Sequence, residues 1–89
     1  MKGEKMQDLQ QKIIRHYGLK NQKDMLHLAL SDLAAALIWE KDKKIKEDIA
    51  KVLNLLEQII VFQDWEEDIY RLKYYEINRT LERIKNDRL

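Results

Sequence analysis

The chain of 89 residues is long enough for one domain, residues 1–89, built around a single small core. Its 17 basic and 16 acidic side chains are interleaved and leave a net charge of +1, which argues against a nucleic-acid-binding surface. The lack of cysteine excludes disulfides and zinc–thiolate sites. The longest apolar run, residues 33–39, is far shorter than the roughly 20 residues that cross a bilayer, and the polar start lacks a signal-peptide core. We therefore expect a cytoplasmic protein with neither nucleic acid nor membrane as a partner.

Helix-breaking residues are nearly absent, because the chain has no proline and its two glycines lie near the start. Apolar periodicity predicts four helices, over about residues 4–16, 21–40, 45–62 and from 64 to beyond 83. Gly18 is expected to end the first helix in a left-handed cap, and Asn21 to cap the start of the second. Residues 42–44 are predicted to form a polar connection, and Asp64 followed by Glu67 predicts a capping box at the start of the fourth helix.

The second and third predicted helices carry more apolar surface than one helix face can bury. Between residues 25 and 39 the apolar side chains cover nearly the whole circumference, which is typical of a helix buried all round. In the fourth helix the apolar stripe slips phase between Leu72 and Ile77, where we expect a change of packing partner. A chain this short buries only about 60–65% of its unfolded surface. We therefore expect an all-α helical hairpin array or small bundle, completed by a dimer or tetramer that shares its core.

Residues that carry common catalytic chemistry are sparse. Ser31 is the only serine, and neither His16 nor His27 has an acid partner at a suggestive spacing. No glycine-rich phosphate loop is present. Trp39 and Trp65 stand near predicted helix ends, where tryptophan more often anchors packing than stacks on a ligand. No common catalytic set is therefore indicated.

Four charged residues lie within the apolar central helices and form the candidate acidic site: Asp32, Glu47, Asp48 and Lys51. Asp48 and Lys51 are three residues apart and share a helix face. A charge in an apolar setting costs on the order of several kcal/mol unless it is paired or bound to a metal. Two interpretations follow: Asp32 lies at a boundary or pairs with Lys51 across the helices, or an acidic functional site lies between them.

From about residue 13 to residue 84 the chain resembles the MazG-like all-α nucleotide pyrophosphohydrolases, especially their short phage-type members. The stretches that carry the resemblance are residues 17–25, 31–38, 46–59 and 79–84. Members of that family are similar to one another in a Glu-Glu-x-x-Glu motif on one helix and a Glu-x-x-Asp motif on the next. The resemblance implies a four-helix fold whose carboxylates hold magnesium, which positions a nucleoside triphosphate for cleavage between its α and β phosphates.

This sequence departs from the family pattern at the metal ligands. Residues 28–32 read Leu-Ala-Leu-Ser-Asp and residues 48–51 read Asp-Ile-Ala-Lys, so only two of the four ligand positions remain acidic. Those four positions are Ala29, Asp32, Asp48 and Lys51. A lysine ammonium there would repel a divalent cation, so we expect Lys51 to replace the metal in an ion-pair cluster and no cofactor to be bound.

The leading hypothesis is a catalytically degenerate MazG-like protein that acts as a homo-oligomeric binding or interaction protein of phage or prophage type. An alternative is an active magnesium-dependent pyrophosphohydrolase, with Asp32, Glu47 and Asp48 as ligands, joined by Glu40 or a partner-chain residue.

A third hypothesis is a nucleotide-signal sponge that binds its ligand without cleaving it. Arg71, Tyr74, Tyr75 and Arg79 of the fourth helix would stack on and ion-pair with the nucleotide. Such tyrosines are more typical of interface packing than of ligand binding. Glu76 stands where the family carries a basic residue, although Arg79 is kept. A purely protein-binding helical oligomer remains a further alternative.

Overall fold

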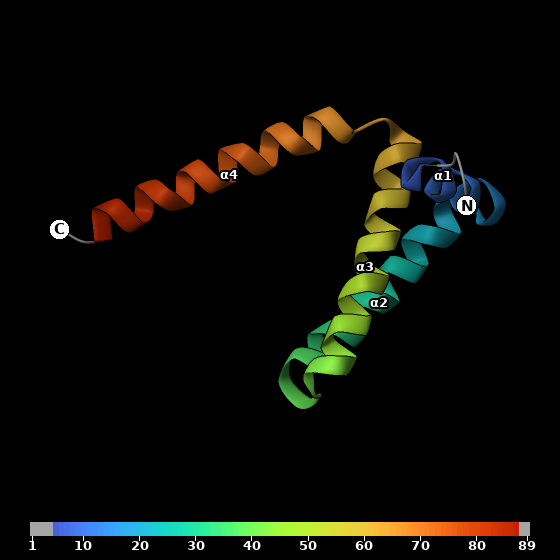
Figure 1. Ribbon diagram of the computed structural model, residues 1–89, viewed down its shortest axis with the longest axis horizontal. Coiled ribbons are helices and arrows are strands. Elements are labelled where there is room, and N and C mark those ends of the chain that lie inside the picture. The colour runs from blue at the N-terminus through green and yellow to red at the C-terminus, as the bar shows by residue number, and fades with distance from the viewer. Residues whose placement is uncertain (1–4, 88–89) are drawn as a thin grey trace.

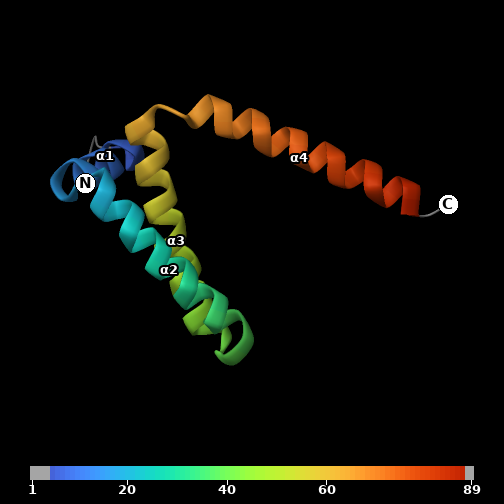
Figure 2. The ribbon, with the colours of Figure 1, turned by 180° about the vertical axis from the view of Figure 1, so that it is seen from behind.

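The computed structural model describes residues 5–87, and that segment is entirely helical apart from its short connections. Its elements are α1 (Met6–Tyr17), α2 (Leu19–Trp39), α3 (Asp42–Gln63) and α4 (Glu66–Asp87). The all-α prediction is confirmed for this segment, whereas residue 4, the predicted start of the first helix, lies outside it. Figure 1 shows α2 and α3 side by side as an antiparallel hairpin, with α1 near its upper end and α4 extending away. The reverse view in Figure 2 shows the same arrangement.

The hairpin is held by a narrow seam of small and branched side chains. Ala29 and Ala36 are seven residues apart on α2, so they lie on one face and let α3 approach closely. Val52 and Leu55 of α3 complete the buried cluster with Ala29. A seven-residue repeat is typical of helices packed at a shallow angle, which is the geometry that a hairpin with a short connection requires. Apart from Ala29 and Ala36, only Gln22 of α2 is buried within a single chain.

Helix α1 packs across the end of the hairpin nearest the α3 C-terminus. Ile14 is fully buried there. Gln11 donates a hydrogen bond from Nε2 to the carbonyl oxygen of Val61 at 3.0 Å, which ties α1 to the last turn of α3. The turn from α1 to α2 is therefore positioned over one end of the hairpin.

The connections differ from their predicted forms. The prediction that Asn21 caps the second helix is wrong, because α2 begins at Leu19 and Gly18 occupies the N-cap position. The polar connection at residues 42–44 is wrong as well, since α3 already begins at Asp42. Asp64 ends α3 in a left-handed conformation with φ 60° and ψ 42°, so it caps the C-terminus of α3 instead of starting a capping box for α4.

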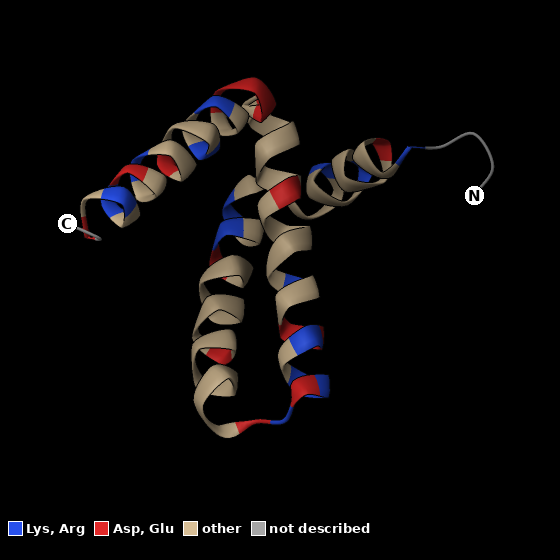
Figure 3. Ribbon diagram, turned by 60° about the vertical axis from the view of Figure 1, so that its left-hand side comes forward, with Lys and Arg blue, Asp and Glu red and all other residues tan. Residues whose placement is uncertain are grey.

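Helix α4 has no buried residue among those described. Among residues 5–87 it packs only on α3, near the junction between the two helices, and its first residue, Glu66, accepts a hydrogen bond from Gln7 of α1 at 2.8 Å. Figure 3 shows acidic and basic residues interleaved along α4, whereas the hairpin has long uncharged stretches. The Cα radius of gyration is 16.3 Å, compared with about 12 Å for a compact chain of this length. The single chain therefore leaves much of its apolar surface uncovered, including Leu72, Ile77 and Leu81 of α4.

Replacing Gly18 by alanine is expected to lower the free energy of unfolding by about 1–3 kcal/mol. Gly18 has φ 90° and ψ 151°, a region that residues with a Cβ rarely adopt, although an added Cβ would meet no atom within 4 Å. The penalty is therefore backbone strain and not a clash. Urea unfolding at fixed chain concentration measures it, and Asp64→Gly is the matched control. Asp64 also has positive φ, so glycine there should be neutral or stabilising by up to about 1 kcal/mol. Equal losses in both variants would contradict the strain argument.

Candidate functional site

The charged cluster between α2 and α3 centres on Asp48, whose side chain is only 2% exposed. Its Oδ1 atom accepts a hydrogen bond from Lys44 Nζ at 2.7 Å, one turn earlier on the same helix. Its Oδ2 atom is buried and has no hydrogen-bond donor among residues 5–87. The ion-pair partner of Asp48 is therefore Lys44, and the predicted pairing with Lys51 is wrong.

Lys44 lies in a field of several carboxylates. Its hydrogen bond with Asp48 raises the pKa of the Lys44 ammonium above the ordinary lysine value, and this outweighs the opposing effect of desolvation. The negative charges of Asp48, Asp32 and Glu47 raise the pKa further. Asp32 and Glu47 are themselves exposed. Three of the four predicted site residues thus act electrostatically on Lys44, a lysine that the sequence interpretation did not place in the site.

The residues present do not fit the magnesium ion that the family resemblance implies. Within residues 5–87, no three acidic or histidine side chains are placed so that they could hold a metal ion together. Ala29 offers no ligand atom and is buried in the seam. Asp48 already binds an ammonium group, and its remaining oxygen is enclosed. The positions of the family pattern therefore do not present together the carboxylates that would hold magnesium in that family.

The stability that Lys44 contributes is expected to fall in strongly alkaline solution. A raised folded-state pKa means that the contribution is complete below the ordinary lysine value of 10.5 and is lost as pH rises through the higher folded-state pKa. The difference in unfolding free energy between wild type and Lys44→Gln should therefore be constant near neutral pH and shrink above 10.5. Urea unfolding across a pH series measures it. The control is Lys43→Gln, which removes an exposed lysine of the same turn, and its difference in unfolding free energy from wild type should not change with pH. A Lys44→Gln difference that also stays constant above pH 10.5 would contradict the assignment of Lys44 to the ion pair with Asp48.

Lys51 lies in a separate place, on an open groove of about 430 Å³ where α1, α2 and α3 meet. The groove is lined by Tyr17, Asn21, Gln22, Met25, Lys51, Asn54, Leu55 and Gln58. The α1–α2 turn supplies one end, and the second half of α3 supplies most of the polar wall. The groove holds one basic residue, and none of its lining residues is acidic.

A chain of buried amides lies beside this groove. Gln22 Nε2 donates to Gln58 Oε1 at 2.6 Å, and Gln58 Nε2 donates to Gln10 Oε1 at 2.9 Å. All three glutamines are at most 5% exposed. Asn21 Nδ2 donates into one end of the chain at Gln22 Oε1, and Gln10 Nε2 donates out of the other end to Asn54 Oδ1. This row of hydrogen-bonded amides, the amide chain, therefore joins α1, α2 and α3, and its buried donors and acceptors find their partners inside the protein.

Sequence reasoning missed this amide chain. One signal was present, because Gln22 stands seven residues before Ala29 and so continues the seam of α2. Gln58 similarly lies three residues after Leu55 on α3. A glutamine at the same helical spacing as the buried seam residues is expected to be buried too, and its amide then needs a hydrogen-bond partner. The third member, Gln10, could not be located in this way, since the sequence does not fix how α1 crosses the hairpin.

The candidate ligand residues of α4 are only partly brought together. Arg79 lies over the ring of Tyr75 at 5.9 Å and bonds to Glu76 at 3.4 Å. Arg71 bonds to Asp68 at 2.8 Å. These arginines and Tyr74 are exposed on a helix without a facing element. The hollow beside Tyr75 and Arg79 is lined by α4 alone, so it offers a nucleotide one wall only.

The other flank of the hairpin is aliphatic. Leu26, Leu30, Leu33 and Leu37 follow one another on α2 at spacings of four, three and four residues. Ile49, Leu53, Leu56 and Ile60 repeat the same spacing on α3. On α3, helical geometry places the row opposite the groove-lining residues. On α2 the row lies on the side of the seam away from the groove, and its half-buried members Leu26 and Leu33 pack against the buried cluster. The exposed members are here called the aliphatic face: Leu30, Leu37, Ile49, Leu53 and Leu56.

None of the helices described for residues 5–87 is long and apolar enough to cross a membrane. Comparisons with protein-family models, curated proteins and solved structures found no match. The function must therefore be argued from the groove, the charged cluster and the aliphatic face.

Proposed function

We propose that this chain is a non-catalytic, homo-oligomeric binding protein, related to the short phage-type MazG-like proteins, whose copies associate through the aliphatic face. The observation that carries the proposal is the exposure of two aligned aliphatic rows on one flank of the hairpin. Leu37 is 60% exposed and Leu53 is 49% exposed in the single chain. Contiguous apolar surface of this kind marks association sites on soluble proteins. Two hairpins joined face to face would form a four-helix bundle with a shared core.

The extended position of α4 also supports association. A helix with no buried residue gains little stability from tertiary packing, and helices that lack such packing are marginal in water. Its apolar residues Leu72, Ile77 and Leu81 are all more than half exposed. A second copy offers a surface on which this helix can be covered.

The charged cluster supports a non-catalytic role. The cleavage that the family carries out depends on a divalent ion. Of the two acidic positions kept here, Asp48 binds Lys44, and the negative charge of Asp32 also acts on that ammonium group. The buried Asp48 oxygen that lacks a donor is enclosed and offers no open coordination position.

Sedimentation equilibrium of the full chain tests the association. The expected result is a mass that is a whole multiple of 10.8 kDa at micromolar concentration, independent of added magnesium. A monomer at all concentrations would contradict the proposal.

Assays of pyrophosphate release from each deoxynucleoside triphosphate with magnesium or manganese test the proposed absence of catalysis. No release is expected, and release that Asp48→Asn abolishes would establish the enzyme instead.

A further inference from the structure

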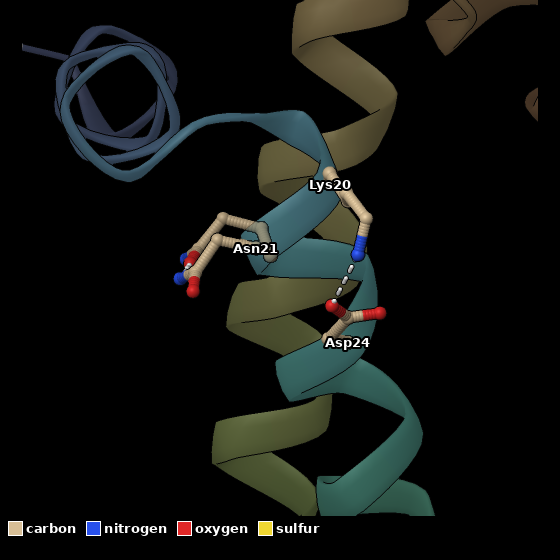
Figure 4. A network of polar contacts seen from close by, with 4 residues as sticks. Lys20, Asn21 and Asp24 are labelled. Carbon is tan, nitrogen blue, oxygen red and sulfur yellow. Dashed lines mark hydrogen bonds and ion pairs between the residues drawn. The ribbon is translucent and has the colours of Figure 1, made fainter.

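The groove around Lys51 has the electrostatic character of a site for an anion. Lys51 makes no ion pair with any residue from 5 to 87, although it stands on the same helix as the Lys44–Asp48 pair. The acid nearest in sequence on the α2 wall is Asp24, which bonds to Lys20 at 3.1 Å. Figure 4 shows this pair on one side of α2, with the Asn21 side chain directed to the other side. No carboxylate lines the groove itself, and the carboxylate of Glu57, which accepts from the same Gln10 amide as Asn54 at 3.2 Å, lies outside the groove lining.

The amide chain fixes which hydrogen-bonding groups the groove can offer. Asn54 accepts from Gln10 through Oδ1, which leaves its Nδ2 group as the donor. Asn54 is exposed and lines the groove three residues after Lys51, so both side chains lie on one face of α3. An ammonium and an amide N–H₂ side by side form a donor pair, and such a pair suits the oxygens of an anionic group.

The rest of the groove suits a small organic ligand. Met25 and Leu55 provide apolar wall beside the polar groups. The volume of about 430 Å³ lies within the range of small-molecule sites. The buried glutamines hold α1, α2 and α3 together, and Gln10 binds the Asn54 carboxamide, so that amide donor is oriented before a ligand arrives.

We propose that this groove binds the phosphate or carboxylate group of a small organic anion directly through Lys51 and Asn54, without a metal ion. The site shares no residue with the aliphatic face, so it does not depend on the proposed association. The charge at position 51 excludes a divalent cation and attracts the anion itself.

Nuclear magnetic resonance titration of the uniformly ¹⁵N-labelled full chain in EDTA tests this. The probes are phenyl phosphate and phenylacetate, which share an aromatic ring and differ in the anionic group, with neutral benzyl alcohol as the control. At least one anion should produce saturable shifts of the Asn21 and Asn54 side-chain amides, and benzyl alcohol should produce none. The probe that binds more tightly identifies phosphate or carboxylate as the preferred group. The absence of saturable shifts with both anions, or equal shifts with benzyl alcohol, would overturn the proposal.

Two substitutions test the donor pair. Lys51→Gln removes the charge, and Asn54→Asp keeps the Oδ acceptor for Gln10 while adding a negative charge to the groove. Each should weaken anion binding about tenfold or more. Lys43→Gln makes the same charge change as Lys51→Gln outside the groove and should leave the affinity within about twofold. Anion affinity that is equal in wild type and Lys51→Gln would overturn the assignment of Lys51. The sedimentation mass of Lys51→Gln and of Asn54→Asp should equal that of wild type. The anion-binding proposal and the association proposal can therefore fail independently of each other.

Discussion

Leu53→Glu is expected to convert the associated protein into monomers without unfolding the single chain. Leu53 is 49% exposed in one chain, so a glutamate there can remain in water when the hairpin is alone. In the proposed face-to-face bundle, the same carboxylate would be buried among the leucines of the second copy. Burial of an unpaired charge in an apolar interface costs on the order of several kcal/mol, and two-fold symmetry applies that cost twice.

The expected change is a rise of about a hundredfold or more in the dissociation constant, measured by sedimentation equilibrium. Helical content from circular dichroism should show that α1, α2 and α3 stay folded. The control is Lys43→Gln, which changes the net charge by the same amount outside the aliphatic face and should leave the mass unchanged. A Leu53→Glu protein that sediments like wild type would show that the copies meet elsewhere.

The hairpin could be predicted from the sequence because its signals are local. The absence of proline and the alanines of the second helix favour two long helices that pack closely, and a run of polar residues between them predicts a short connection, although its predicted bounds were wrong. The boundaries were less predictable. Asp64 followed by Glu67 satisfies the capping-box pattern, yet Asp64 adopts a left-handed conformation that ends α3. Aspartate can cap either the start or the end of a helix. Which role Asp64 takes depends on the direction in which the backbone continues after α3.

The charged cluster illustrates a limit of spacing arguments. Asp48 has lysines four residues before it and three residues after it, and both share its side of the helix. Helical side chains lean towards the N-terminus, so the Asp48 carboxylate lies over the preceding turn, where Lys44 stands. Lys51 leans in the same direction but faces the groove that α1 and α2 close. The groove depends on the crossing of α1, which no local pattern in the sequence determines.

Gln58→Leu is expected to lower the free energy of unfolding by about 2–4 kcal/mol. Gln58 is the central member of the amide chain. It accepts from Gln22 and donates to Gln10, and both of those partners are buried. Leucine has a similar volume, so packing changes little, whereas two buried amide groups each lose a hydrogen bond. Urea unfolding at fixed chain concentration measures the loss. Gln7→Ala is the control, because it removes an exposed amide contact to Glu66 and should cost less than about 0.5 kcal/mol.

A second variant separates a lost hydrogen bond from an orphaned amide. Replacing Gln10, Gln22 and Gln58 together by leucine removes both the donor and the acceptor of each hydrogen bond among them. None of the three positions then holds a buried amide without a partner. The triple variant should therefore be more stable than the sum of the single losses implies, with a coupling energy of about 1–3 kcal/mol. Strict additivity would mean that the three amides act independently. In that case they would not hold α1 and α2 against α3 as a unit, and the Asn54 donor of the Lys51 groove would not be oriented in advance of a ligand.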